Sequence, residues 1–160
     1  MDDTRWLTPA ELSAWIKFVA TVELLPGVLD SQLQHDAELT HFEYFVLAML
    51  SEAPGRTLRM TALAARTNST LPRLSHVVSR LEKRGFIART PCEEDRRATN
   101  AELTQLGWEK VVATAPGHVT TVRENVIEPL DARDIADLDR IMGKVLDRLD
   151  PEGRFGSRSS

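Results

Sequence analysis

Basic side chains are concentrated in the middle of the chain, in a segment that carries few acids. Residues 56–97 hold ten arginines and lysines and four acids, a net charge of +6 in a chain whose overall charge is −4, so the remaining residues carry −10. A basic segment within an acidic protein concentrates the attraction for phosphate on one face and reduces non-specific binding elsewhere. This charge distribution favours the binding of a phosphate backbone and predicts double-stranded DNA as a partner.

The densest part of this segment has the periodicity of an amphipathic helix over residues 71–84. The core-facing positions, at i, i+3, i+4 and i+7, are Leu74, Val77, Val78 and Leu81. The opposite arc holds Pro72, Arg73, His76, Ser79, Arg80, Lys83 and Arg84. A solvated charged face is the commoner explanation of such an arc. Arg73 argues against it, because a cation in the first turn opposes the helix dipole by roughly 0.3–1 kcal/mol. We therefore interpret this arc as a surface for an external anion, either a phosphate or a guanine edge.

A second basic feature is the charged hairpin Glu93-Glu94-Asp95-Arg96-Arg97-Ala98. Its opposite charges can hold a turn, and we expect Asp95 to fix the geometry of one arginine, Arg96 or Arg97, while the other points outward. A pre-set arginine loses less entropy on binding, and in a minor groove it senses groove width more than base identity. The alternative for this hairpin is a solvated turn held by local ion pairs.

Helix, strand, hairpin, strand and helix follow one another around these two features, which is the order of a winged helix-turn-helix. We expect Thr61 to cap a short helix, and Asn68-Ser69-Thr70 to turn into the helix over 71–84. Gly85 should end that helix in a left-handed conformation. Strands are predicted over 86–91 and 101–103, with the hairpin over 92–100 between them and a further short strand over 57–60.

Longer helices are predicted on both sides of this unit. Thr8 should cap a first helix that runs to about residue 34, with a kink or break at Pro26-Gly27. Thr40 should cap a second helix that ends at Pro54-Gly55. Thr104 should cap a third helix that runs to about residue 128 and bends at Pro116-Gly117. Asp131 should begin a last helix that runs through residue 149. The flanking helices carry apolar positions at Leu12, Ile16, Val126, Ile127, Leu138, Ile141 and Val145.

The predicted fold class is therefore mainly α with a small β-hairpin wing. All 160 residues should form a single domain, with the winged helix-turn-helix over about 40–103 between dimerisation helices over about 8–34 and 104–150. Residues 151–160 are expected to be a disordered tail.

Composition excludes several classes of protein. We find no apolar run that approaches the roughly 20 residues of a membrane span, and the acidic amino terminus has no signal-peptide pattern. We therefore expect a cytoplasmic protein with no membrane partner. The single cysteine, Cys92, precludes an internal disulfide, and the two acids after it disfavour a redox role. The four histidines lack metal-ligand spacing, and no nucleophile–base pair or phosphate-cradling glycine loop is present. We expect no enzymatic activity and no cofactor or metal.

Several of these segments together resemble one known family. They are Leu63-Ala64-Ala65-Arg66-Thr67, the helix end Arg80-Leu81-Glu82-Lys83-Arg84-Gly85-Phe86-Ile87, the wing Asp95-Arg96-Arg97-Ala98, and Leu103-Thr104-Gln105-Leu106-Gly107. Over residues 8–149 the chain is similar to the MarR (multiple-antibiotic-resistance regulator) family. The resemblance implies a ligand-responsive transcriptional regulator, more often a repressor, that binds a palindromic operator as a homodimer. The alternative is a winged-helix module for protein interaction or dimerisation without specific DNA binding.

The resemblance also assigns site residues. It places Thr70, Arg73, Ser75, His76 and Arg80 where the recognition helix meets the major groove and phosphates, and Asp95 and Arg97 where the wing has its Asp-x-Arg motif. Leu71-Pro72-Arg73-Leu74 departs from the usual small hydroxyl residues at the helix start. A small-molecule effector would bind where the first, second and fifth helices of the family meet, a cleft that Trp15, Phe18, Tyr44 or Trp108 would line. The alternative for these aromatic residues is the core or the dimer interface.

Overall fold

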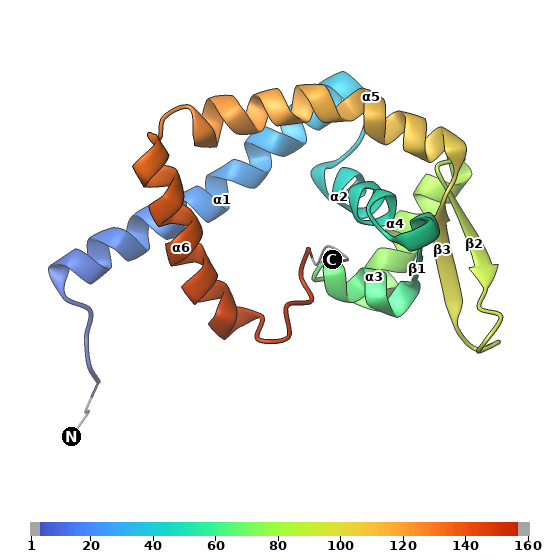
Figure 1. The fold of residues 1–160 in the computed structure, drawn as a ribbon, viewed down its shortest axis with the longest axis horizontal. Helices are drawn as coiled ribbons and strands as arrows, with labels where there is room; N and C mark the ends of the chain where they lie inside the picture. The colour runs from blue at the N-terminus through green and yellow to red at the C-terminus, as the bar shows by residue number, and fades with distance from the viewer. Residues whose placement is uncertain (1–3, 157–160) are drawn as a thin grey trace.

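The winged helix-turn-helix lies beneath one long helix pair and to one side of the last helix (Figure 1). The computed structural model describes residues 4–156. Its elements, in chain order, are α1 (Pro9–Ala37), α2 (His41–Ser51), η1 (Pro54–Arg56), β1 (Thr57–Arg59), α3 (Met60–Arg66), α4 (Leu71–Lys83), β2 (Ile87–Pro91), β3 (Thr99–Leu103), α5 (Gln105–Val122), η2 (Arg123–Ile127) and α6 (Ala132–Leu149). The predicted fold class, mainly α with a small β wing, is confirmed.

Polar caps determine where most of the helices begin. Thr8, Thr40 and Asp131 each form a capping box with the acid three residues on, and Thr104 accepts a hydrogen bond from the Gly107 amide. These four predicted starts are confirmed. The predicted cap at Thr61 is wrong: α3 begins at Met60, with Arg59 at its cap and no side-chain cap bond. Arg59 is still paired with β3, so the helix begins as soon as the strand ends.

The long α1 helix continues through Pro26, where a kink or break was predicted. It has no break and extends to Ala37, three residues past the predicted end, and Glu38 closes it with a left-handed φ of 52°. A proline inside a helix removes one hydrogen bond, and its ring crowds the carbonyl four residues before it, at a cost of roughly 3 kcal/mol that packing of the helix can outweigh. Leu29, Leu33 and Ala37 provide that packing, because they are buried on the part of α1 beyond Pro26.

The wing is a small antiparallel sheet with the strand order β1-β3-β2. Arg59 is paired with Asn100, and Thr90 is also opposite Asn100 across the hairpin. The Cys92 amide donates to the Ala98 carbonyl at 3.0 Å, which closes the loop at the wing tip. β3 begins two residues earlier than predicted, because its pairing with β1 and with β2 extends back to Thr99 and Asn100.

The core lies among α2, α3, α4, the start of α5 and the sheet. Its fully buried side chains are Leu33, Leu39, Val46, Leu47, Leu50, Leu63, Leu74, Val78, Leu81 and Ile87. The recognition-helix residues predicted to face the core, including Val77 at 6% exposure, are all buried. The core therefore holds α4 against α2 and α3 and leaves its other side exposed.

The end of α4, the start of the wing and the start of α5 meet at one junction. Gly85, at φ 80°, donates to the Glu82 carbonyl while Phe86 donates to the Leu81 carbonyl, which is the hydrogen-bond pattern of a Schellman motif. Thr104 donates from its amide to the Phe86 carbonyl at 3.0 Å and from its hydroxyl to the Gly85 carbonyl at 2.6 Å. The first turn of α5 is thereby joined to the turn that follows α4.

The segment after α6 makes specific contacts as far as it is described. The Asp150 carboxylate accepts hydrogen bonds from the Arg154 and Phe155 amides, and the Gly156 amide donates to the Arg66 carbonyl at 2.9 Å. The Phe155 ring lies 5.4 Å from that of Phe45 in α2. Residues 151–156 thus fold back onto the winged domain, where a disordered tail was predicted, and residues 157–160 lie outside the described residues.

One side of α1 and of α6 is apolar and exposed. Trp15, Ile16, Leu138 and Ile141 are between 37% and 58% exposed, and no described residue of α6 is buried. By length and composition alone, α1 is apolar enough to cross a membrane. Only 6% of its most apolar 18-residue stretch is buried within the chain. Glu11, Lys17, Glu23 and Asp30 interrupt the helix, so it contains no uninterrupted apolar run of the length that a membrane span needs. An apolar helix face left open in a single chain is typical of a subunit interface.

Replacing Gly107 with alanine should destabilise the fold at the junction. An added Cβ would lie 2.2 Å from the Phe86 carbonyl oxygen, which is a backbone atom that cannot move aside freely. We expect Gly107→Ala to lower the free energy of unfolding by about 1–3 kcal/mol, the range of overpacking. Urea denaturation at a fixed protein concentration measures the change.

The matched control is Gly143→Ala in α6, where no atom lies within 4 Å of the added Cβ. Alanine should leave stability unchanged or raise it by roughly 0.5–1 kcal/mol through helix propensity. Equal effects of the two substitutions would contradict the close approach at Gly107.

Candidate nucleic-acid interface

The start of α4 is exposed and preorganised by its cap. The Thr70 hydroxyl accepts a hydrogen bond from the Arg73 amide at 3.4 Å, so this predicted contact residue has a structural role in the free chain. Leu71, Pro72, Arg73 and His76 are exposed, and Ser75 is partly exposed. The first two turns of α4 are therefore accessible to a large partner.

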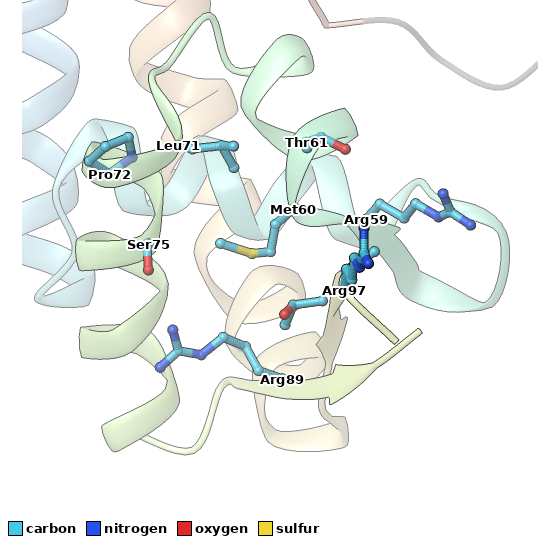
Figure 2. Close-up of a pocket in the computed structure, with 10 residues that line it drawn as sticks. Arg59, Met60, Thr61, Leu71, Pro72, Ser75, Arg89 and Arg97 are labelled. Carbon is cyan, nitrogen blue, oxygen red and sulfur yellow. The ribbon is translucent and has the colours of Figure 1, made fainter. Parts of the chain in front are cut away.

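A groove of about 380 Å³ separates α4 from the wing (Figure 2). Its lining residues are Arg59, Met60, Thr61, Leu71, Pro72, Ser75, Arg89, Arg97, Ala98 and Thr99. In Figure 2, Leu71, Pro72 and Ser75 of α4 lie on one side of the groove, and Arg89 of β2 and Arg97 of the wing loop lie on the other. The groove brings Leu71, Pro72 and Ser75 at the start of α4 opposite Arg97 of the hairpin.

Two of the three arginines in the groove have acidic partners. Arg59 pairs with Glu94 of the wing loop at 3.1 Å, and Arg89 pairs with Glu82 of α4 at 2.8 Å. Arg89 also donates to the Ser79 hydroxyl at 3.0 Å, and its bonds to Glu82 lower the pKa of that carboxyl. These pairs fix the wing to β1 and to α4. Arg59 and Arg89 were not predicted as site residues. The sequence indicated these pairs only in that Glu94 and Glu82 carry the opposite charge.

The wing tip presents free guanidinium groups. Asp95 accepts a hydrogen bond from the Arg97 amide at 3.0 Å, and the Ala98 amide donates to the Asp95 carbonyl at 2.8 Å. In the part of the chain that is described, neither the Arg96 nor the Arg97 guanidinium has a hydrogen-bond or ion-pair partner. Asp95 therefore fixes the turn through the backbone, where a contact with an arginine side chain was expected, and both arginines remain available to an anion.

Arg80, predicted to meet DNA, binds another part of the chain. Its guanidinium donates to Glu43 Oε1 at 2.8 and 3.2 Å, and the Glu43 side chain is 7% exposed. The other oxygen of Glu43 accepts from the Thr40 amide at 2.9 Å, so this buried carboxylate is satisfied on both sides. Arg80 fixes α4 to the start of α2, and Glu43 is a residue that the sequence analysis missed.

Arg73 and His76 lie on a different side of α4 from the wing groove. They line a second hollow, of about 540 Å³, with Asp30, Thr40, Phe42, Val77 and Arg80. The Arg73 guanidinium lies over the Phe42 ring at 4.3 Å, a cation–π contact. The predicted contact residues of α4 therefore divide into two sets, with Ser75 towards the wing and Arg73, His76 and Arg80 towards α1 and α2.

The aromatic residues proposed for an effector cleft lie in three separate settings. Trp15 and Phe18 contact each other on α1, with ring centroids 6.2 Å apart, and Trp15 is 54% exposed. Trp108 packs on the core and lies under the Arg56 guanidinium at 4.0 Å. Tyr44 is buried, with its ring 4.7 Å from that of His118. Within one chain, these side chains do not line a common cavity.

Two histidines that the sequence spacing did not connect lie close together between α2 and α5. The His41 and His118 rings are 6.4 Å apart, and His118 Nδ1 is buried without a hydrogen-bond partner. Burial lowers the pKa of His118, and His41 lowers it further. Burial also lowers the pKa of His41, against the opposite effect of Asp30. Both pKa values are therefore lowered at the contact between the winged domain and the long helices, which makes each ring harder to protonate than a free imidazole.

Cys92 is buried at the base of the wing, at 6% exposure. Its thiol is covered, and the described residues contain no group of three or more potential metal ligands. The described residues therefore offer no evidence for a redox or metal centre.

Comparisons with known proteins identify a consistent set of relatives. The sequence profile of the MarR family matches residues 39–99. The structure superposes on Sco3205, a MarR family transcriptional regulator from Streptomyces coelicolor solved in complex with DNA, with a TM-score of 0.88 and 43% identity over 94% of each chain. AbsC, a MarR family transcriptional regulator from the same organism, gives a TM-score of 0.86 and 38% identity over 91% of this chain and 98% of that one.

Curated relatives match over a shorter region. The transcriptional repressor YetL of Bacillus subtilis is 31% identical over 90 residues, which cover 54% of this chain and 54% of YetL. The uncharacterised regulator YdcH of the same organism is 36% identical over 81 residues, or 55% of its length. The chain thus spans about half the length of the curated relatives it matches.

Removal of Arg80 should destabilise the chain by leaving Glu43 buried without its cation. Because the Arg80 side chain is 47% exposed, solvent screens part of the loss, and we expect Arg80→Met to cost about 1–3 kcal/mol. In a Glu43→Gln background, where the capping bond is kept but the charge is removed, the same substitution should cost less than half as much. A double-mutant cycle from urea denaturation measures this coupling, and additive effects would contradict the pairing.

The two histidines should make stability depend on pH. Their folded pKa values are lowered from about 6.5, so their contribution is complete above pH 6.5 and is lost as the pH falls through the lower folded values. We expect His118→Gln to flatten the decline in melting temperature between pH 6.5 and 5. The control is His35→Gln, at a side chain that is 89% exposed. A decline of unchanged slope in the His118 variant would exclude this source.

Proposed function

The chain belongs to the MarR family of transcriptional regulators, and from this premise we propose that it is a sequence-specific DNA-binding regulator that represses transcription from a palindromic operator as a homodimer. The observation that carries the proposal is the groove between α4 and the wing, with exposed side chains on one wall and unpaired arginines at the wing tip. A cytoplasmic location follows from this function.

The geometry supports a division of roles between the two walls. The exposed start of α4 has the size and polarity to enter a major groove, where base edges present distinct hydrogen-bond patterns. The wing tip carries Arg96 and Arg97 on a turn fixed by Asp95, and such a tip fits the adjacent minor groove, where an arginine senses groove width. Arg59 and Arg89 line the space between the two walls, through which the phosphate backbone would pass.

A homodimer is supported by the exposed apolar faces of the end helices. The large apolar side chains on α1 and α6 that remain exposed include Leu12, Trp15, Ile16, Val22, Leu24, Ile135, Leu138, Ile141 and Leu146. A second copy of the chain would cover them. Two recognition helices would then have to lie about 34 Å apart to meet successive major grooves, so the dimer sets the spacing of the half-sites.

A small-molecule effector would act through this spacing. An effector changes the equilibrium only by its difference in affinity for the two arrangements, so it must bind where the winged domain meets the long helices. His118 of α5 contacts Tyr44 of α2 at such a place. We assign the effector to this region by its position in the fold.

The interaction-module alternative has no supporting observation. A protein-binding face would carry apolar side chains where Arg73, His76 and Arg80 are found. Those positions hold charged or polar groups, and the hollow that they line contains Asp30 and Thr40 as well.

We expect Arg97→Ala to weaken operator binding by about ten-fold while leaving the dimer intact, because it removes a guanidinium that has no hydrogen-bond or ion-pair partner among the described residues. A titration of the purified protein against the duplex upstream of its own gene, with a shuffled duplex in parallel and at two salt concentrations, measures this effect. Sedimentation of the free variant measures the dimer.

Arg133→Ala is the matched control, because Arg133 is exposed on α6, outside the winged domain. Its operator affinity should equal that of the unmodified protein. Unchanged affinity in the Arg97 variant, or equal binding of the operator and shuffled duplexes, would contradict the proposed function.

A further inference from the structure

Two apolar residues occupy the most exposed end of the recognition helix. Leu71 and Pro72 are the first two residues of α4, and both line the groove between α4 and the wing (Figure 2). The Leu71 residue is 45% exposed, and Pro72 is also exposed. Large apolar groups at the tip of a basic surface are unusual, because arginine, serine and asparagine supply most contacts to DNA.

The fold itself accounts for only part of this pair. Pro72 suits the first turn of a helix, where its missing amide would have no partner in any case. Leu71 packs incompletely: the side chains of α4 that build the core are Leu74, Val77, Val78 and Leu81, and Leu71 is not among them. Part of the Leu71 side chain is thus left uncovered by the fold and is available for a different contact.

Charge determines what this pair can meet. Arg97 lines the groove from the wing without an ion-pair partner, whereas Arg89 and Arg59 line it already paired with carboxylates, so the groove attracts phosphate chiefly through Arg97 (Figure 2). A duplex drawn into the groove would bring base edges, rather than phosphates, to the tip of α4. The one apolar group on the base edges of the major groove is the C5-methyl group of thymine.

We infer that Leu71 and Pro72 form an apolar contact for thymine methyl groups, and that the operator carries thymine in each half-site where α4 begins. The inference rests on the proposed function and specifies which base the site selects. Ser75, one turn further along the same wall, then adds a hydroxyl that can donate to or accept from the neighbouring base.

The test replaces thymines of the operator one at a time with deoxyuridine. This substitution removes only the C5-methyl group and keeps base pairing and every hydrogen-bond group of the base edge. We expect one or two positions in each half-site to lose affinity by about three- to ten-fold, the effect of one buried methyl group and its contacts. All other positions should bind as the parent duplex does.

Two protein variants complete the design. Leu71→Ala should show less than half of the affinity difference between the parent and deoxyuridine duplexes, because only Pro72 is then left to contact the methyl group. Leu106→Ala is the matched control: Leu106 is 51% exposed in the first turn of α5, outside the groove, and this variant should keep the full sensitivity. Circular dichroism establishes that both variants are folded. The deoxyuridine scan with the unmodified protein tests the contact without any change in the protein.

The outcomes separate the two claims. Tight binding of the parent operator with no loss at any deoxyuridine position overturns the thymine contact and leaves the proposed function standing. Sensitivity that persists undiminished in Leu71→Ala also overturns it, because the Leu71 side chain would then make no contact with the methyl group. Failure to prefer the operator over a shuffled duplex overturns the proposed function, and with it this inference.

Discussion

The close approach of α5 to the turn after α4 is the constraint on which the rest of this structure depends. Gly107 has no side chain, so the first turn of α5 can lie against the Phe86 carbonyl, and Thr104 binds both carbonyls of that turn. Three elements leave this point: the recognition helix, the wing strands and the long helix that packs on α1. A displacement of α5 must therefore move α4 and the wing together, which is what a regulator needs if its long helices set the spacing of two DNA-binding units.

Ion pairs complete this rigid unit and use several of its arginines. Arg80 fixes α4 to α2 through Glu43, Arg89 fixes the wing to α4 through Glu82, and Arg59 joins β1 to the wing loop through Glu94. The basic charge of residues 56–97 is thus only partly available to a ligand. The division has a physical logic, because a partly buried pair holds geometry, whereas an exposed and unpaired arginine is the better partner for phosphate.

Local patterns made the winged segment predictable, and long-range contacts limited the prediction of its site. The Thr70 cap, the apolar spacing of α4 and the left-handed Gly85 each depend on a few neighbouring residues, so the helix and its ends followed from the sequence. The partner of Arg80 lies 37 residues away and that of Arg59 lies 35 residues away. No spacing rule connects such residues, and the same is true of His41 and His118. A kink or break was predicted at Pro26, and no break occurs there, because packing of the buried residues beyond it holds the helix.

Hydroxyl-radical footprinting of the duplex upstream of the gene determines whether two copies of the chain bind one operator through α4 and the wing, since it reports where the protein contacts each strand. We expect protections related by two-fold symmetry, with two centres about one helical turn, roughly 34 Å, apart and wing contacts in the minor grooves beside them. A cleavage pattern unchanged by the protein, or a single protected patch without symmetry, would contradict it.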